Sequence, residues 1–472
     1  MLYFNENTEG VFIFTTIAFK NEKLYTIKQK MENQNNKNGY LIPFILVTSL
    51  FFLWGLANSL NGSLIKHFQT ALDLSRAQAG IVDSAFYIGY FVMALPAGLV
   101  MQKYGYKKGI IAGLLLYAIG AILFYPAAEV RAYSFFLFAL FVIASGLAFL
   151  ETAANLYMTV MGDEKSGSWR VNFAQSFNGT SIILGPIIGS LFIFSNKEYT
   201  REQLAAMPFQ EAEAIRIAEA HSVQMPYLVV AGLVLFVALL FAITKMPEIG
   251  SDAAPTAGAK VVSFDKNVSF KGLFRHRHLV LGALGIFFYC GGQTAIWGYF
   301  VDFKQSVSNE QHVGIVNSIY QVTSDMSLKQ IASLHASAAL VLFMVGRFAG
   351  TWMMKSIPAE RLLAIFAVGV IVSLLGAMLT SGLVALVCFM VVYFFMSIMF
   401  PTIFALGTRG LPAQEAKLGS SLMIMSIVGA AFVPPLTGLL YQSYGAQASM
   451  ILPLICFVYI LYFALEGYKI KG

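Results

Sequence analysis

The sequence predicts an all-α integral membrane protein with twelve transmembrane helices in two pseudo-symmetric halves of six. Of its 472 residues, 58% are hydrophobic and only 12% are charged, and the mean hydropathy is +0.70. A soluble domain averages about 25% charged residues, so this chain has too few charges to cover a water-facing surface. The apolar residues also fall in runs of roughly twenty, the length that crosses a hydrocarbon core.

Twelve apolar runs predict the membrane helices, in chain order. The first six lie near residues 41–66, 77–102, 108–128, 133–161, 173–195 and 225–245, and the second six near 279–303, 332–354, 360–380, 382–408, 419–442 and 446–467. We therefore divide the chain into a cytoplasmic N-terminal segment (1–39), an N-terminal half (40–245), a central cytoplasmic linker (246–277), a C-terminal half (278–468) and a cytoplasmic tail (469–472). Met31 is a more natural cytoplasmic start than Met1, which leaves open that residues 1–30 are an upstream extension.

Basic residues in alternate short loops predict the orientation. The loops after the second, fourth, eighth and tenth runs carry Lys103, Lys107, Lys108, Lys165, Arg170, Lys355, Arg361, Arg409 and Lys417. Positively charged loops stay on the cytoplasmic side, so both termini are expected there, in the cytoplasmic (inner) membrane of a bacterium. This placement explains the pI near 9.1 without nucleic-acid binding, which we do not expect. The loops at 196–224 and 304–331, and the flanking Asp302 and Lys304, are expected to face water outside.

Nothing in the sequence indicates a cofactor, a metal or an enzyme. Cys290, Cys388 and Cys456 each lie inside an apolar run and form no Cys-x-x-Cys pair, so they are interpreted as buried small hydrophobes. None of the six histidines has a partner at metal-ligand spacing. A Gly-x-x-x-x-Gly-Lys-Ser/Thr loop is missing, which argues against an ATP-driven pump, and no nucleophile–base set suggests an enzyme.

The two halves repeat each other weakly. The fifth run carries Gly185-Pro186 and the eleventh carries Pro434-Pro435, while Gly98 and the basic loop that follows it are echoed by Arg347 and Lys355 around the eighth. Repeated halves around a site at the membrane midplane are typical of secondary transporters.

Two carboxylates are candidates for proton coupling. Glu151 sits mid-way along the fourth run with no basic residue in that run to pair with it. Polar groups at membrane depth are costly and often functional, and a carboxyl group there can bind and release a proton near neutral pH. The alternative is a residue that hydrogen-bonds one helix to another. Asp83 lies near the outer end of the second run, where a plain interfacial residue is the simpler interpretation.

Amide and indole side chains gather at helical spacing on three runs. They are Trp54, Asn58 and Asn61 in the first run, Gln175 and Asn178 in the fifth, and Gln293 and Trp297 in the seventh. Amides donate to and accept from hydroxyl groups, and an indole packs on the C–H face of a sugar. Amides can also join helices to each other, but three such faces favour a sugar-binding cavity. We add Asn155, which lies in the same run as Glu151.

Several stretches are recognisable along nearly the whole chain from about residue 40. They are Phe52–Asn58, Ser84–Phe91, Leu150–Asn155, Ala174–Asn178, Gly292–Ala295 with Trp297, and Phe400–Phe404. Together they resemble the fucose permease group of the major facilitator superfamily. The loop with Gly98, Gly105, Lys107 and Lys108 resembles the superfamily's signature loop, with Gln102 where an acid is common, and Arg347 is expected to join it as a gate element.

The resemblance implies a major facilitator fold, L-fucose/H⁺ symport, and sugar contacts from Gln175, Asn178 and Gln293. It also implies a carboxylate pair on the first and fourth helices. Glu151 fills the fourth-helix position, but Gly62 stands at the first-helix aspartate position. The neighbouring asparagine is replaced by Ser59, the tyrosine of the tenth helix by Phe400, and a proline by Leu156.

Three interpretations of these departures stay open. Asp83, where the group usually has glutamine, is expected at a depth similar to that of Gly62 and would replace the missing carboxylate. Alternatively, the sugar is carried by facilitated diffusion without a proton. A third interpretation is a sugar sensor on a transporter fold, against which stand the short linker and tail. In each case the expected partners are a small sugar, protons for the coupled carrier, and the lipid bilayer around a monomer.

Overall fold

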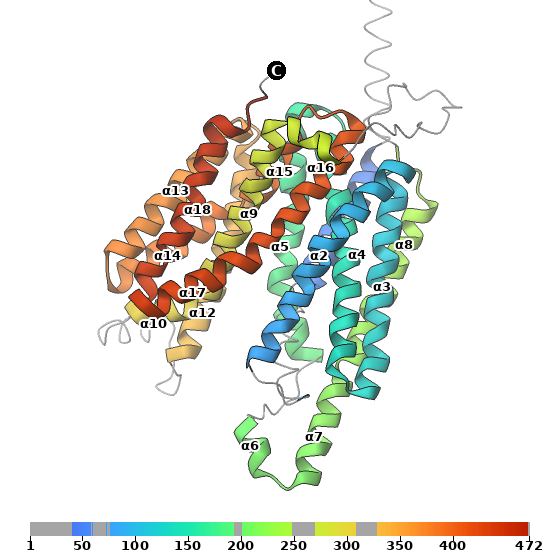
Figure 1. Cartoon of the computed structure of the whole chain (residues 1–472), viewed down its shortest axis with the longest axis vertical. Coiled ribbons are helices and arrows are strands. Elements are labelled where there is room, and N and C mark those ends of the chain that lie inside the picture. The colour runs from blue at the N-terminus through green and yellow to red at the C-terminus, as the bar shows by residue number, and fades with distance from the viewer. Residues whose placement is uncertain are drawn as a thin grey trace, which may run out of the picture. The chain divides into compact units, whose positions relative to one another are not determined.

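The computed structural model describes residues 40–57, 59, 72, 76–192, 201–247, 270–307 and 328–470. The chain divides into two units, Met1–Ile45 and Leu46–Gly472, and the packing described below belongs to the second. In the described ranges all regular secondary structure is helical (Figure 1). Helices suit a bilayer because each backbone N–H and C=O finds its partner within the same segment.

The described part of the first half contains eight helices after a first helix at Tyr40–Ala57. They are α2 (Arg76–Tyr104), α3 (Tyr106–Val130), α4 (Tyr133–Val160), η1 (Glu164–Ser166), α5 (Gly167–Phe192), α6 (Arg201–Ala206), α7 (Phe209–Ser222) and α8 (Gln224–Ile243).

The second half runs from the linker to the C-terminus. Its described helices are η2 (Phe270–Arg275), α9 (Arg277–Gly298), α10 (Phe300–Val307), α12 (Leu328–Met353), α13 (Ala359–Leu379), α14 (Gly382–Met396), α15 (Met399–Thr408), α16 (Ala413–Met425), η3 (Ser426–Val428), α17 (Gly429–Ser449), α18 (Ile451–Tyr462) and η4 (Phe463–Gly467).

Each predicted apolar run corresponds to a helix. Nine helical segments in the described ranges are long and apolar enough to span a membrane. The helices α2 and α5, and α18 together with η4, occupy the other three predicted runs. Several runs are composite, because α14 and α15 share one and α16, η3 and α17 follow each other in the next.

Glycines allow the closest helix contacts. A Cβ atom added at Gly146 of α4 would lie 2.5 Å from the backbone nitrogen of Tyr117 in α3, and one added at Gly120 would lie 2.6 Å from that of Ile143. Small residues let backbones approach in membranes, where helices associate by packing rather than by the hydrophobic effect.

Four sequence-based expectations were wrong in detail. The fifth helix begins at Gly167, six residues before the predicted run, because its first turns are polar. Residues 201–222, expected as loop, form α6 and α7, and α7 continues the line of α8 in one helical segment from Phe209 to Ile243. Hydropathy does not identify a helix that is rich in charged residues. One of these charges, Glu213 of α7, pairs with Arg131 at the end of α3 at 2.6 Å.

The other two corrections concern lysines. Lys417, expected in a loop, lies in α16 with only 4% of its surface exposed, and its Nζ sits 4.7 Å from the centre of the Tyr106 ring. Lys304, expected in water, is equally buried in α10. Long lysine stems pack along apolar and aromatic surface, which a count of charges does not register.

The basic loops gather at one side of the bundle, which we call the basic side. Lys107 donates to the carbonyl groups of Ala242 and Thr244 at the end of α8, at 2.8 and 2.9 Å. Lys355, just after α12, lies 5.9 Å from the ring centre of Trp169 in α5. Figure 1 shows the end of the chain at this same side.

The two sets of six helices touch each other near the basic side. The helix α2 packs on α16, and α5 packs on α12 and α15. At Gly98 of α2 the approach is so close that an added Cβ atom would meet Ser421 Oγ at 2.0 Å. Beyond this contact, toward the other side of the membrane, the two sets enclose the cavity described next.

Candidate functional site

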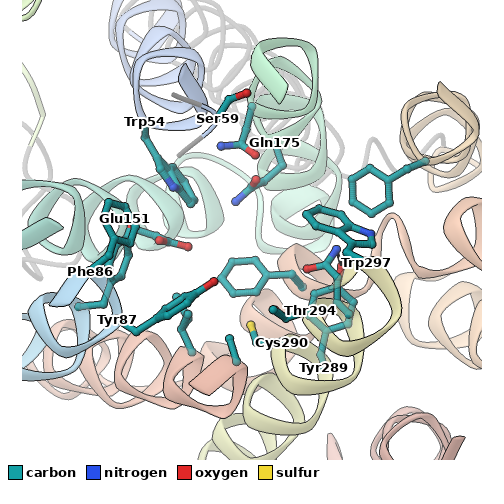
Figure 2. A pocket seen from close by; sticks show the side chains of 18 of the residues that line it. Trp54, Ser59, Phe86, Tyr87, Glu151, Gln175, Tyr289, Cys290, Thr294 and Trp297 are labelled. Carbon is teal, nitrogen blue, oxygen red and sulfur yellow. Dashed lines mark hydrogen bonds between the residues drawn. The ribbon is translucent and has the colours of Figure 1, made fainter. Parts of the chain in front are cut away.

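A cavity of about 370 Å³ lies between the two sets of helices (Figure 2). The first helix, α2, α4 and α5 line it from the first six, and α9, α12, α15, η3 and α17 line it from the second six. This volume is at the lower end of the range for small-molecule sites, about 300–1,000 Å³, and suits a ligand the size of a monosaccharide.

Glu151 reaches this cavity from the middle of α4. Its side chain is 2% exposed, and none of the ion pairs among the described residues involves it. The hydroxyl of Tyr90 on α2 interacts with the Glu151 carboxyl group, and Phe86 and Tyr87 lie beside it in Figure 2. A carboxyl group without a cationic partner at this depth is a candidate proton site.

Two indoles face the cavity from opposite halves. Trp54 packs on Phe51 of the same helix, and Trp297 of α9 stacks on Tyr393 at 6.3 Å between ring centres. Within the described ranges, both indole nitrogens are buried and have no hydrogen-bond partner. Because atoms enclosed by protein are not reached by a ligand, the two indoles offer the cavity the surface of their rings rather than their N–H groups.

The amides are held by hydrogen bonds that fix their orientation. Gln175 Nε2 donates to Asn155 Oδ1 at 3.2 Å, and Asn178 Nδ2 donates to the carbonyl oxygen of Phe51 at 3.3 Å. Gln293 Nε2 donates to the Tyr289 hydroxyl at 2.8 Å. Gln175, Asn178 and Gln293 line the cavity, and within the described ranges each keeps an oxygen or N–H that makes no hydrogen bond, whereas Asn155 is fully buried behind Gln175.

A buried polar contact closes the cavity toward the basic side. Arg347 of α12 donates through Nη1 to the carbonyl oxygen of Gln175 at 2.8 Å and through Nε to that of Ser397 at 2.9 Å. Its guanidinium also lies 4.6 Å from the ring centre of Phe343. Beside it, Asn172 Nδ2 of α5 donates to Thr402 Oγ1 of α15 at 3.0 Å. The bond from Arg347 to Gln175 and the bond from Asn172 to Thr402 join the first six helices to the second six.

The signature loop lies at the basic side, away from the cavity. Gly105 separates α2 from α3 with φ +86°, a conformation that favours glycine. Lys107 holds the end of α8, and Lys108 lies 5.4 Å from the ring centre of Tyr104. The loop is therefore placed to brace α2 against its neighbours while Gly98 meets α16.

Part of the predicted site cannot be compared with the structure. Asn58, Asn61 and Gly62 lie outside the described residues, and Asp83 lies in α2 where side chains are not described. It therefore stays a prediction that Asp83 supplies the carboxylate that is missing at position 62.

Sequence reasoning missed the aromatic wall of the cavity. Phe86, Tyr87 and Tyr90 on α2 and Tyr289 on α9 all line it. Two signals were available: the α2 aromatics belong to a stretch that matches the permease group, and Tyr289 stands four residues before Gln293, the spacing of helix neighbours. Thr294, on the same helix, was quoted in a matching stretch but not as a site residue.

Comparison with known proteins identifies the family. Residues 47–427 match the Major Facilitator Superfamily. The chain belongs to this superfamily. It is 39% identical over 435 residues to the L-fucose-proton symporter of Escherichia coli K12, covering 92% of this chain and 94% of that one. It is also 37% identical over 435 residues to a putative glucose/galactose transporter of Helicobacter pylori J99, covering 90% and 96%.

Solved structures agree. The crystal structure of the major facilitator superfamily transporter FucP in the outward conformation matches with a TM-score of 0.80 at 37% identity, covering 92% of this chain and all of that one. The proton:xylose symporter XylE matches with a TM-score of 0.64 at 12% identity, which concerns the fold alone. The predicted superfamily, the all-α twelve-helix fold and the assignment as a transporter rather than an enzyme are confirmed.

Proposed function

We propose that this protein imports a hexose or deoxyhexose, with L-fucose as the first candidate, by alternating access and with coupling to protons. The observation that carries the proposal is the composition of the cavity. One buried carboxyl group, Glu151, shares it with the indole rings of Trp54 and Trp297 and with the amides of Gln175, Asn178 and Gln293. Relatives with this fold are L-fucose-proton symporters and glucose/galactose transporters.

The mechanism follows from the charge on Glu151. When Glu151 is ionised, enclosing its charge away from water costs free energy, so the sugar-free carrier favours the state in which the carboxylate stays hydrated. Protonation removes that charge, and a carboxylic acid can then donate to a sugar hydroxyl. Sugar contacts from both halves would favour the state in which the halves close around it, because a ligand shifts an equilibrium only by its differential affinity for the two states.

The orientation in the membrane is part of this proposal. The basic side would be cytoplasmic, with both termini there, as the positive-inside rule expects for a bacterial cytoplasmic membrane. The contacts of Arg347 and Asn172 would then close the carrier toward the cytoplasm, so that the cavity is reached from outside. The carrier acts as a monomer with two six-helix halves, 40–245 and 278–468.

Uptake into proteoliposomes tests the proposal. Labelled L-fucose should accumulate above equilibrium under an inward proton gradient, with alkalinisation of the outer medium. Glu151→Gln should abolish gradient-driven accumulation while sugar exchange across the membrane continues. The matched control, Glu360→Gln, removes a carboxylate that pairs with Arg409 at 3.6 Å outside the cavity and should leave accumulation unchanged.

The departures at Gly62 and Phe400 support one second candidate, an uncoupled sugar uniporter. Phe400 lines the cavity without a hydroxyl group, where the permease group is expected to carry a tyrosine. For a uniporter the sugar would equilibrate across the membrane regardless of the proton gradient, and Glu151→Gln would leave the steady level of sugar unchanged. Binding of sugar without any flux would instead favour the sensor.

A further inference from the structure

One wall of the cavity consists of small aliphatic and thiol side chains rather than aromatic rings, amides or carboxyl groups. It consists of Ile427 in η3, Ala430 in α17 and Cys290 in α9. These side chains offer carbon atoms and a thiol, which is a weak donor and a weak acceptor. We call these three residues the apolar wall.

Tight packing between α9 and α17 makes this wall continuous. A Cβ atom added at Gly291 would lie 2.3 Å from Val433 Cγ2 and 2.9 Å from the carbonyl oxygen of Gly429. Cys290 and Ala430 are the immediate chain neighbours of Gly291 and Gly429, and both line the cavity. Cys290 and Ala430 are 7% and 6% exposed, so a ligand group against this wall meets side chains rather than bulk water.

The rest of the lining is aromatic or polar, and the aromatic rings include Phe86, Phe343 and Phe400. Glu151, Gln175, Asn178 and Gln293 place carboxyl and amide groups around the cavity, and Thr294 adds a hydroxyl one turn beyond Cys290 on α9 (Figure 2). A hexopyranose carries a hydroxyl group at nearly every position of its edge. In a 6-deoxyhexose the methyl group on C5 is the one apolar substituent, so it is the group that matches a wall of this kind.

We propose that the apolar wall receives the substituent on C5 of the bound sugar and selects a methyl group there, so that the carrier prefers 6-deoxyhexoses to the matching hexoses. This inference rests on the proposed sugar transport. A hydroxymethyl group placed against the wall leaves its hydroxyl without a strong partner, which costs about 10- to 100-fold in affinity. An apolar pocket rejects an added hydroxyl only this weakly, so the larger sugar remains a poor ligand rather than a non-ligand.

The relatives make this distinction relevant. Carriers named for L-fucose and for glucose/galactose are 39% and 37% identical to this chain, so overall similarity does not separate the two substrate classes. The apolar wall distinguishes the two substrate classes, because it offers no strong hydrogen-bond partner to the C6 hydroxyl group of a hexose. A hydroxyl group added to the wall would supply that partner.

The test compares two sugars that differ by one oxygen atom, L-fucose and L-galactose. For the full-length carrier in proteoliposomes, we would measure the concentration of each that halves the exchange of labelled L-fucose. The wild type should need about 10- to 100-fold more L-galactose than L-fucose. Ala430→Ser and, separately, Ile427→Thr each place a hydroxyl on the wall and should lower this ratio at least fivefold. Ala431→Ser is the matched control, since Ala431 is the next residue of α17 and its side chain is exposed outside the cavity.

The outcomes separate this proposal from the function on which it rests. A lowered ratio in either wall variant, with the control unchanged, supports the wall. A wild-type ratio near one, or wall variants that match the control, overturns the wall while sugar transport stands. Wild-type protein that exchanges none of L-fucose, galactose and glucose overturns the proposed function and the wall together.

Discussion

Arg347 offers the sharpest test of how the two halves are held together. Its side chain bonds to two carbonyl groups, but only the bond to Gln175 crosses from the second six helices to the first. The bond to Ser397 lies within the second six and persists whichever way the halves tilt. The substitution Arg347→Met keeps an unbranched side chain and removes both bonds, so its effect on the equilibrium between states comes from the bond to Gln175.

The magnitude follows from this one contact. A hydrogen bond from a charged group contributes about 1.5–3 kcal/mol. Because about 1.4 kcal/mol is a factor of ten, losing it shifts the equilibrium toward the state open at the basic side by about 10- to 150-fold. If that state holds about 1% of the wild-type molecules, it should rise to about 10–60%.

Distance measurements between spin labels on the two halves read this shift directly. Exposed positions 165 and 361 lie at the basic side on different halves and can carry the labels once the three native cysteines are replaced. Arg347→Met should add a population at longer distance. Arg347→Lys, which keeps the charge, should restore part of the short-distance population.

The matched control is Arg409→Met. Arg409 also lies near the basic side, but its ion pair with Glu360 stays within the second six helices, so its loss should not move the distance distribution. If Arg347→Met leaves the distribution of the wild type unchanged, the bond to Gln175 does not hold the halves closed. Equal opening in the control would attribute the effect to a general loss of positive charge.

Three further predictions concern packing and the cavity. Gly98→Leu drives a side chain into α16 and should add the same long-distance population, whereas Gly232→Leu, at a glycine with no atom within 4 Å of an added Cβ, should not. Gly146→Leu should lower the melting temperature, because overpacking against α3 costs about 1–3 kcal/mol, and Gly232→Leu again serves as the control. Trp297→Phe reduces the aromatic surface that the cavity offers to the C–H face of a sugar, and should weaken sugar binding about 2- to 10-fold by calorimetry with transport-competent protein. An unchanged affinity would remove this indole from the site.

The sequence predicts the part of the site where polarity is costly. Glu151, Gln175 and Gln293 stand out because a carboxyl or amide group inside an apolar run needs a reason to be there. The same argument places Asn155 in the cavity, but the structure places it behind, bonded to Gln175. Sequence alone cannot tell a side chain that meets the ligand from one that orients its neighbour.

Other features carry no such signal. Aromatic residues make up 14% of the chain, so polarity does not mark Tyr90 or Tyr289 as facing the cavity rather than lipid. The signals that do point to them, a matching stretch and the spacing from Gln293, depend on other residues. The helix α7 contains charged residues at short spacing, so its low hydropathy predicts a loop rather than a helix. Lys417 looks like a loop residue for the same reason, although its stem is buried and its amine rests on an aromatic ring.

Gln175 connects the sugar site with the closed side of the carrier. Its side chain lines the cavity and its own carbonyl oxygen accepts the bond from Arg347, whose side chain also lines the cavity. A ligand that hydrogen-bonds to the Gln175 amide therefore acts on α5 at the residue where α5 is joined to α12. Coupling between binding and opening needs a contact whose strength differs between the two states. The contact between Arg347 and Gln175 is such a contact, and a ligand bound to the Gln175 amide touches the same residue. No long pathway through the bundle is therefore required.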